Sequence, residues 1–236
     1  MKRSHEAWRS ADLFDSGYGY LVVSRFKADG RVEAGSFLLD VFCLGVKDAN
    51  FHHFSSMADY QEGLIDRLFP DGNPMRMTPE AARKLTEGAI SYAKGLGFSP
   101  ASDYKKAGRV FGGITTANCD EQFVFGKNGK PLYAQGLSES PACVERILRT
   151  LEARCGEGSY DYILAADNFD EEENGQDAIT DPVRRTELER MAAELRASHP
   201  GKEVRINGTG RQRSPTWSGW SPNRCWSPHR ITNRSK

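Results

Sequence analysis

The densest run of apolar, β-forming positions in this chain lies between Gly17 and Asp48. Tyr18 to Phe26 predicts one strand and Val32 to Leu44 its hairpin partner, because both stretches are rich in valine, leucine and aromatic residues. Gly30 supplies the positive φ that the short loop between them needs. The second strand is apolar on both faces apart from Asp40, which predicts a central strand covered by helices.

Apolar residues recur with a helical period in several other segments. Residues 4–16 predict a short amphipathic helix, and residues 101–108 add one or two helical turns. Three further helices each follow a serine or threonine that can cap the first turn, and in two of them a proline takes the first helical position. They begin after Ser56, Thr78 and Ser140 and run to about residues 69, 95 and 155.

A second hairpin is predicted around Asn128-Gly129, because this dipeptide is the strongest short hairpin signal in the chain. Its strands would be Gln122 to Phe125 and Leu132 to Ala134. Tyr160 to Leu164 predicts a short closing strand. The fold class that follows is α+β: two β-hairpins forming a mixed or antiparallel sheet covered by helices, in one globular domain over residues 1–165.

The character of the chain changes near Ala166. Residues 166–181 read as an acidic linker, residues 182–198 as a charged helix, and residues 199–236 as a basic tail rich in Trp, Arg, Ser and Pro, without helical or strand period and therefore predicted to be disordered. From Gly201 onward, eight basic residues and one acid give +7. The whole chain sums to zero, so residues 1–200 carry −7. The tail can fold back on the acidic body, or bind an external polyanion or an acidic protein surface.

Composition narrows the class of protein further. The N-terminal MKRSHEAWRS is basic, but no apolar run follows it, and no stretch is long and apolar enough to cross a membrane, which predicts a cytoplasmic protein with no membrane partner. Five scattered cysteines show no CxxC spacing and so predict neither a zinc site nor a disulfide framework. P-loop, dinucleotide-binding, HExxH and GxSxG motifs are absent, so no cofactor and no established enzyme class is indicated.

Several motifs together resemble a family. The segment YLVVSRFKADGRVEAGSFLLDVFCLGVKD, the run YAKGLGF with Pro100, the FGKNGKPLY hairpin and the ending GEGSYDYIL are similar to a widespread group of uncharacterised bacterial proteins with an FLVDxFCLGVKD-like segment. The resemblance covers roughly residues 8–165. Many members of that group carry a Cys-rich, zinc-binding SEC-C segment, which this chain lacks. The family supplies no activity and no catalytic residues, and a frameshifted remnant of a SEC-C segment is a further interpretation of the tail.

The first candidate site combines Asp40, Cys43, Asp48 and His52 with the adjacent His53. Carboxylates and histidines this close in sequence can bind a divalent metal, and a histidine can activate a cysteine nucleophile. The structural alternative is that Cys43 is an inert thiol in an apolar run, that Asp48 is a turn residue, and that the two histidines point to opposite sides of a strand.

The second candidate is the acidic loop, where five residues fall at positions 1, 3, 5, 6 and 12 of a calcium-loop pattern. They are Asp170, Glu172, Asn174, Gly175 and Asp181. The pattern has faults, since position 12 should be a bidentate glutamate. A solvated acidic linker, with Asp181 capping the following helix, is the favoured interpretation.

The third candidate is the tail, where arginines that can pair with phosphates alternate with tryptophans that can stack on unpaired bases. Its residues are Arg211, Arg213, Trp217, Trp220, Arg224, Trp226 and Arg230. A disordered terminus without a ligand is the alternative. The function expected from the sequence is a binding or adaptor module that contacts nucleic acid through this tail, with a metal-dependent hydrolase or nuclease centred on Asp40 and Asp48 as the competing hypothesis.

Overall fold

The computed structural model describes residues 4–70, 74–136 and 139–164. These residues fall into two compact units, which meet in sequence between Gly129 and Lys130. The predicted acidic linker, charged helix and basic tail lie outside the described residues. No helix in the described part is long and apolar enough to cross a membrane. The α+β class is confirmed for the described residues, which combine a five-stranded antiparallel sheet with helices.

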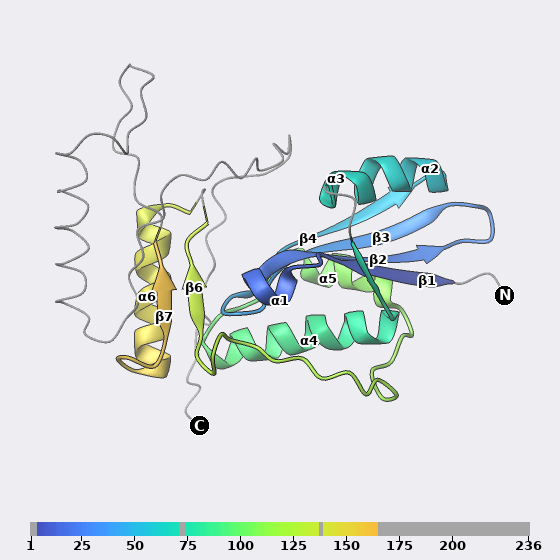
Figure 1. Cartoon of the computed structure of the whole chain (residues 1–236). Helices are drawn as coiled ribbons and strands as arrows, with labels where there is room; N and C mark the ends of the chain where they lie inside the picture. Colours follow the sequence, from blue (N-terminus) through green and yellow to red (C-terminus); the bar gives the residue numbers. More distant parts are fainter. Residues whose placement is uncertain (1–3, 71–73, 137–138, 165–236) are drawn as a thin grey trace, which may run out of the picture. The chain divides into compact units, whose positions relative to one another are not determined.

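The first unit is built on a sheet with strand order β4-β3-β2-β1-β5, in which every pair is antiparallel (Figure 1). The predicted hairpin forms its centre, with Tyr18 opposite Asp40 and Phe26 opposite Val32. The strands are β1 (His5–Arg9), β2 (Tyr18–Phe26), β3 (Val32–Asp40), β4 (Gly45–Phe54) and β5 (Met75–Met77).

One irregularity divides the β3–β4 ladder. Leu39 lies opposite Val46 but Leu38 lies opposite Asp48, so Lys47 is an extra residue on β4. An extra residue of this kind interrupts the ladder and increases the local twist. Beyond it, Asp48, Asn50 and His52 share the sheet face that carries Leu38 and its neighbours at every second position.

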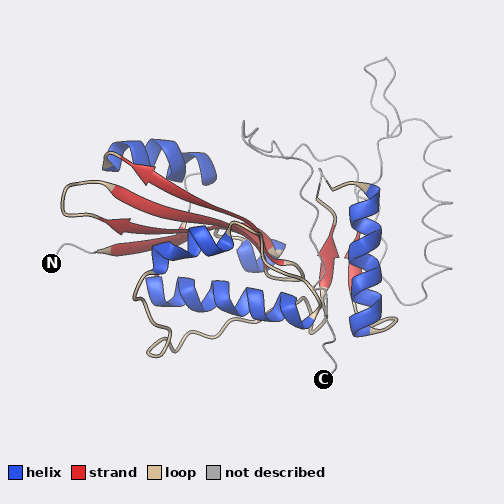
Figure 2. Ribbon diagram, turned by 180° about the vertical axis from the view of Figure 1, so that it is seen from behind, coloured by secondary structure: helices blue, strands red, loops and turns tan. Residues whose placement is uncertain are grey.

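The helices cover the two faces of the sheet unequally (Figure 2). The face called here the α4 face carries fully buried Leu21, Val23, Phe37 and Leu39, and packs against three helical elements. These are α4 (Pro79–Gly95), α5 (Tyr104–Ala107) and the 3-10 helix η2 (Gly108–Phe111). The approach is close, because a Cβ placed on Gly35 would lie 2.9 Å from Ala107 O.

The opposite face, called here the α2 face, is covered by a helical stretch of three consecutive elements. They are α2 (Met57–Tyr60), the π-helical turn η1 (Gln61–Ile65) and α3 (Asp66–Leu68). The fully buried Tyr60 ring contacts Phe26 and Phe54 edge-on, which fixes the stretch to the sheet. Short helix α1 (Leu13–Ser16) connects β1 to β2.

The predicted helix starts are confirmed by their caps. The side chain of Ser56 accepts from Asp59 N at 3.1 Å, and that of Thr78 accepts from Ala81 N at 3.1 Å. Each cap satisfies one of the backbone N–H groups that a helix leaves without an internal partner. Local sequence therefore determined where these helices begin.

A long connection after η2 lies along α4. Arg83 and Lys84 of α4 donate to the carbonyls of Ile114 and Cys119, the second at 2.8 Å, and the ring of Phe125 stacks on Tyr92 at 5.7 Å. Side chains of the helix, rather than a strand ladder, thus hold this segment.

The described residues of the second unit form a small α/β arrangement. Strand β6 (Leu132–Ala134) pairs in parallel with β7 (Asp161–Ile163), and helix α6 (Pro141–Cys155) connects them. Ser140 caps α6 as predicted, accepting from Cys143 N at 3.4 Å. A parallel pair needs such a crossover, since a short turn cannot reverse the chain twice.

Three predicted elements were wrong. Residues 4–16 do not form one helix, because His5–Arg9 gains strand neighbours on both sides, β2 and β5. The predicted strand to Leu44 ends at Asp40, and the unpredicted strand β4 follows the turn. Tertiary pairing overrides local preference at both places.

The third error is the second hairpin. Asn128 and Gly129 do form a turn with positive φ, at 52° and 79°. However, residues 122–125 form no strand, and their aromatic rings pack elsewhere, Phe123 on Phe14 and Phe125 on Tyr92. The turn was predictable from the dipeptide, whereas the strands flanking it were not.

Candidate functional site

Asp40, the last residue of β3, holds the turn that leads into β4. It is only 6% exposed, and its Oδ1 accepts from the backbone N–H groups of Phe42 at 3.1 Å and Cys43 at 2.8 Å. Burial raises the pKa of this carboxyl to about 6, against the opposing influences of the Lys47 charge and the N–H groups of the turn. Its acceptor is therefore engaged by the protein's own backbone.

Cys43 lies in the same turn, between residues that are themselves buried. Its side chain is fully buried, and the thiol is not part of a disulfide. A thiol enclosed among apolar groups packs as a small hydrophobic side chain and is poorly accessible to a substrate. The position suits packing better than nucleophilic catalysis.

Asp48, His52 and His53 belong to β4, so Asp48 is a strand residue rather than the predicted turn residue. Asp48 and His52 lie on the α2 face and His53 on the α4 face, as the alternation of a strand requires. The structure therefore divides the first candidate between a buried turn and two sides of one strand. Within the described residues, no group of three or more His, Cys, Asp and Glu side chains is placed to hold a metal ion.

Four hydrogen-bonding residues do share the α2 face of β3 and β4, and we call them the polar row: Ser36, Asp48, Asn50 and His52. Nε2 of His52 lies 2.9 Å from Ser36 Oγ, and Nδ2 of Asn50 donates to Asp48 Oδ2 at 2.9 Å. Sequence reasoning missed Ser36 and Asn50. The signal was the polar residue at every second position from Asp48 to His52.

The electrostatics of the polar row follow from partial burial. Burial lowers the pKa of His52, while the Asp48 charge raises it and His53 lowers it. Tyr20, on the same face, has its pKa raised by burial and by Asp48. A largely neutral imidazole and a neutral phenol therefore flank one carboxylate, a set suited to hydrogen bonding.

A second group lies around the β3–β4 turn, and we call it the turn-end patch: Tyr18, Phe42, Lys47 and Lys127. Nζ of Lys47 lies 5.4 Å from the ring centre of Tyr18, and Nζ of Lys127 lies 5.6 Å from that of Phe42. Tyr18 is 44% exposed and is the aromatic one among the exposed large hydrophobic side chains of the described residues, the others being Met57, Met75 and Val124. The patch combines two cations with an accessible aromatic ring.

A third polar cluster lies inside the first unit and has a structural explanation. Ser24 Oγ donates to Tyr60 OH at 2.7 Å, and Tyr60 OH donates to Glu6 Oε1 at 3.2 Å. Burial raises the pKa of Tyr60 far above its usual range, so the phenol stays protonated. The cluster anchors α2 to β1 and β2.

The remaining predicted site residues are outside the described part of the chain. This applies to the calcium-loop candidates Asp170, Glu172, Asn174 and Asp181. It applies equally to the tail residues Arg211, Arg213, Trp217, Trp220, Arg224, Trp226 and Arg230.

Comparison with known proteins gave no match: no family model, no curated protein and no solved structure is significantly similar to this chain. The resemblance to the bacterial family thus stays a prediction from the motifs alone.

Proposed function

We propose that this protein is a cytoplasmic binding or adaptor module that contacts single-stranded nucleic acid through its basic tail, residues 199–236. The sequence supports the proposal with the tail's net charge of +7 and with Trp217, Trp220 and Trp226 among its arginines. Arginine neutralises phosphates and releases counterions, whereas tryptophan stacks on unpaired bases.

The observation that favours a binding role over an enzymatic one is the burial and backbone hydrogen bonding of Asp40. A metal-dependent hydrolase centred on Asp40 and Asp48 needs both carboxylates to reach one metal or one water. Asp40 is instead enclosed, and its Oδ1 already accepts two backbone hydrogen bonds. The hydrolase hypothesis therefore receives no support from the geometry of this carboxylate.

The turn-end patch of the first unit is a second place where the protein can contact the nucleic acid. Tyr18 presents an accessible ring on which a base can stack, and Lys47 and Lys127 supply charges beside it. Residues 1–165 carry a net charge of only −1, because most of the acidic excess lies in residues 166–200. A local patch of two cations and an aromatic ring is therefore the part of this domain best suited to contact a nucleic-acid strand.

The proposal is tested by titrating the full chain with a single-stranded RNA at low salt and following tryptophan fluorescence. We expect quenching, a steep loss of affinity with added salt, and weaker binding of a duplex of the same length. A chain truncated after Pro200 should not bind, and it keeps Trp8 as an internal reference for its folding.

The double variant Tyr18→Ala, Lys127→Ala tests the contribution of the body. Loss of one stacked base corresponds to roughly 1–3 kcal/mol, so affinity should fall about tenfold or more while the tail is unchanged. Equal binding by the truncated and full chains would contradict the tail's role. Equal binding by the double variant and the wild type would contradict the role of the turn-end patch but not that of the tail.

A further inference from the structure

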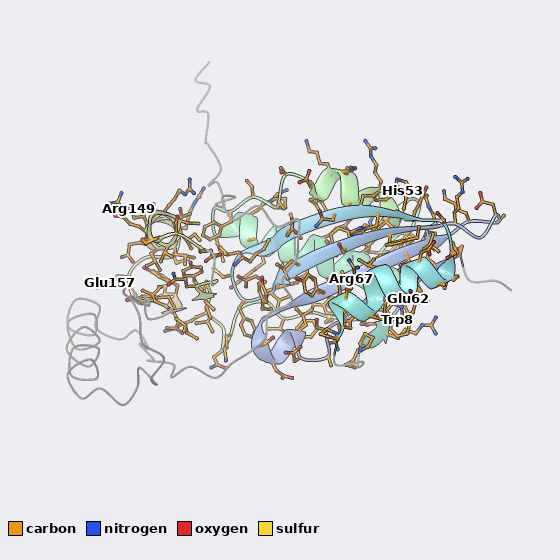
Figure 3. The ribbon with its side chains drawn as sticks, turned by 90° about the horizontal axis from the view of Figure 1, so that it is seen from above. Trp8, His53, Glu62, Arg67, Arg149 and Glu157 are labelled. Atoms are coloured by element: carbon orange, nitrogen blue, oxygen red, sulfur yellow. The ribbon has the colours of Figure 1, made fainter. Side chains whose placement is uncertain are left out.

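Strand β4 forms one edge of the five-stranded sheet. Its paired neighbour among the described strands is β3, and at its beginning the backbone of Ala101 donates to Val46 O at 3.0 Å. In Figure 3, which views the sheet from above, His53 lies by the β4 edge, whereas Trp8, Glu62 and Arg67 lie towards the opposite edge. The helical stretch α2–α3 contacts β4 through Tyr60 and Phe54 at the end of the strand. The outer side of β4 from Asp48 to Phe54 has no strand beside it in the described structure.

Helix α5 packs against β4 and Ala101 bonds to its start, but no described strand pairs with its outer side beyond Lys47. Natural sheets guard long edges with lysines, prolines, bulges or a covering segment, because unpaired N–H and C=O groups attract another strand. Here the extra residue and the only lysine of β4, both at Lys47, stand at the start of the strand. From Asp48 to Phe54 the sequence DANFHHF contains neither lysine nor proline, and Asn50 and His53 are exposed.

We propose that β4 pairs antiparallel with β4 of a second copy of this chain, about a two-fold axis at Asn50. Two-fold symmetry requires a surface that is complementary to itself, so residues must match in reversed order. In this register Asp48 of each copy lies opposite His52 of the other, which gives two carboxylate–imidazole pairs.

The two members of each pair have the atoms for this contact. His52 uses Nε2 towards Ser36 Oγ, and Asp48 uses Oδ2 for Asn50, so Nδ1 and Oδ1 form no hydrogen bond within the described residues. Directly opposed side chains of neighbouring strands have Cβ atoms about 4.5–5.5 Å apart, within reach of a hydrogen bond between these groups. The second copy would thus bind the polar row through His52 Nδ1 and Asp48 Oδ1, the atoms not used within one copy.

The other face of the strand is complementary in size. In the same register the small Ala49 lies opposite the half-buried Phe51, again twice, so neither two large nor two small side chains meet. Asn50 lies opposite itself on the axis, where two amides can bond to each other. This inference concerns assembly and does not depend on the proposed nucleic-acid contact.

Charge exchange on the full chain tests the pairing, with the dissociation constant of the dimer measured by analytical ultracentrifugation. His52→Asp places two carboxylates opposite each other, and Asn50→Lys places two ammonium groups together on the axis. We expect each to raise the dissociation constant by about tenfold or more. Asp48→His combined with His52→Asp restores opposite partners and should return the constant to within about threefold of the wild type.

The control is Asp15→His on the exposed surface of α1, which changes the charge by +1, as Asn50→Lys does, and by the reverse of His52→Asp, and which should leave the constant unchanged. Circular dichroism verifies that each variant is folded. The proposal would be overturned if the wild type stayed monomeric up to a protein concentration of roughly 100 μM, since even weak pairing should be detected there. It would also be overturned if Asn50→Lys left the dimer intact, or if the double variant had as high a dissociation constant as His52→Asp.

Discussion

Two connections of the same sheet differ in almost every respect. The β2–β3 loop, residues 27–31, is largely exposed, and its charges pair at the surface, with Arg31 Nε donating to Asp29 Oδ2 at 2.7 Å. The β3–β4 turn, Val41 to Leu44, is buried throughout and is held by one enclosed carboxylate, that of Asp40. Solvent-exposed contacts stabilise the first connection, whereas buried hydrogen bonds stabilise the second.

The difference shows that the two turns resist change for different reasons. At the exposed loop, solvent replaces any lost contact, and surface ion pairs contribute little. At the buried turn, each lost acceptor leaves an N–H group without water or partner, which costs about 1–3 kcal/mol. Changes in the two connections should therefore have effects of different size even where the chemistry is the same.

The largest expected loss of stability is at Gly45, and it is measured by making one substitution at two glycines. Gly30 and Gly45 both have positive φ, 88° and 72°, so alanine is strained at either site by roughly 1–2 kcal/mol. A Cβ on Gly30 meets nothing within 4 Å, whereas on Gly45 it lies 2.8 Å from Ala89 O and from Ala93 Cβ of α4. Overpacking adds about 1–3 kcal/mol at Gly45 alone.

Urea unfolding of Gly30→Ala and Gly45→Ala measures this contrast directly. We expect Gly45→Ala to lose at least about 1 kcal/mol more of its free energy of unfolding than Gly30→Ala. Gly30→Ala is the matched control, because it carries the same backbone strain without the contact. Equal losses would mean that α4 moves aside, and the buried connection would then be no more constrained than the exposed one.

The next effect in size concerns the charge of Asp40. Its pKa is about 6 when folded and 3.8 as the ordinary reference, so the folded state holds this proton more tightly than the unfolded chain. The associated stability is fully present below about pH 4 and is lost as the pH rises through 6. A difference of about two pKa units corresponds to roughly 3 kcal/mol.

Asp40→Asn isolates this effect, because the amide oxygen can still accept from the turn but cannot ionise. The free energy of unfolding of the wild type relative to the variant should fall by about 3 kcal/mol between pH 3 and pH 7. Urea titrations at several pH values supply the measurement. A difference between the two proteins that is independent of pH would show that Asp40 is not enclosed as described.

The smallest expected effect belongs to Cys43. Cys43→Ala removes one buried sulfur atom from the turn and should cost about 1 kcal/mol through lost packing, without changing nucleic-acid binding. A thiol reagent should label the native protein at Cys43 only slowly, and faster once urea unfolds it. Rapid labelling of the native chain would place the thiol at the surface and reverse the contrast with the exposed loop.

The sequence predicted those elements whose signals are local. The hairpin of β2 and β3, the capped helices and the Asn128-Gly129 turn each depend on a few neighbouring residues, and the structure contains them. It also predicted burial around Cys43, since both sides of that run are apolar. Short-range chemistry was sufficient for these features.

The sequence did not predict what depends on distant partners. Strand β1 was mistaken for a helix because its pairing with β5 joins Ala7 to Met77. Strand β4 was missed because one of its faces is polar, as an edge strand permits. The polar row exists only once β3 and β4 are aligned with Lys47 as the extra residue, and a single sequence contains no sign of that alignment.

The strand order also has a consequence for how the chain reaches its fold. Strands β1 to β4 are neighbours in the sheet in the order in which they occur in the chain, so each new pair closes only the connection just synthesised. Strand β5 must instead return past the whole sheet to β1. Because closing a longer loop costs more entropy, the four-strand meander can form by successive zipping while β5 docks late. During synthesis, the β4 edge is therefore complete before β5 and α4 have emerged to join the sheet.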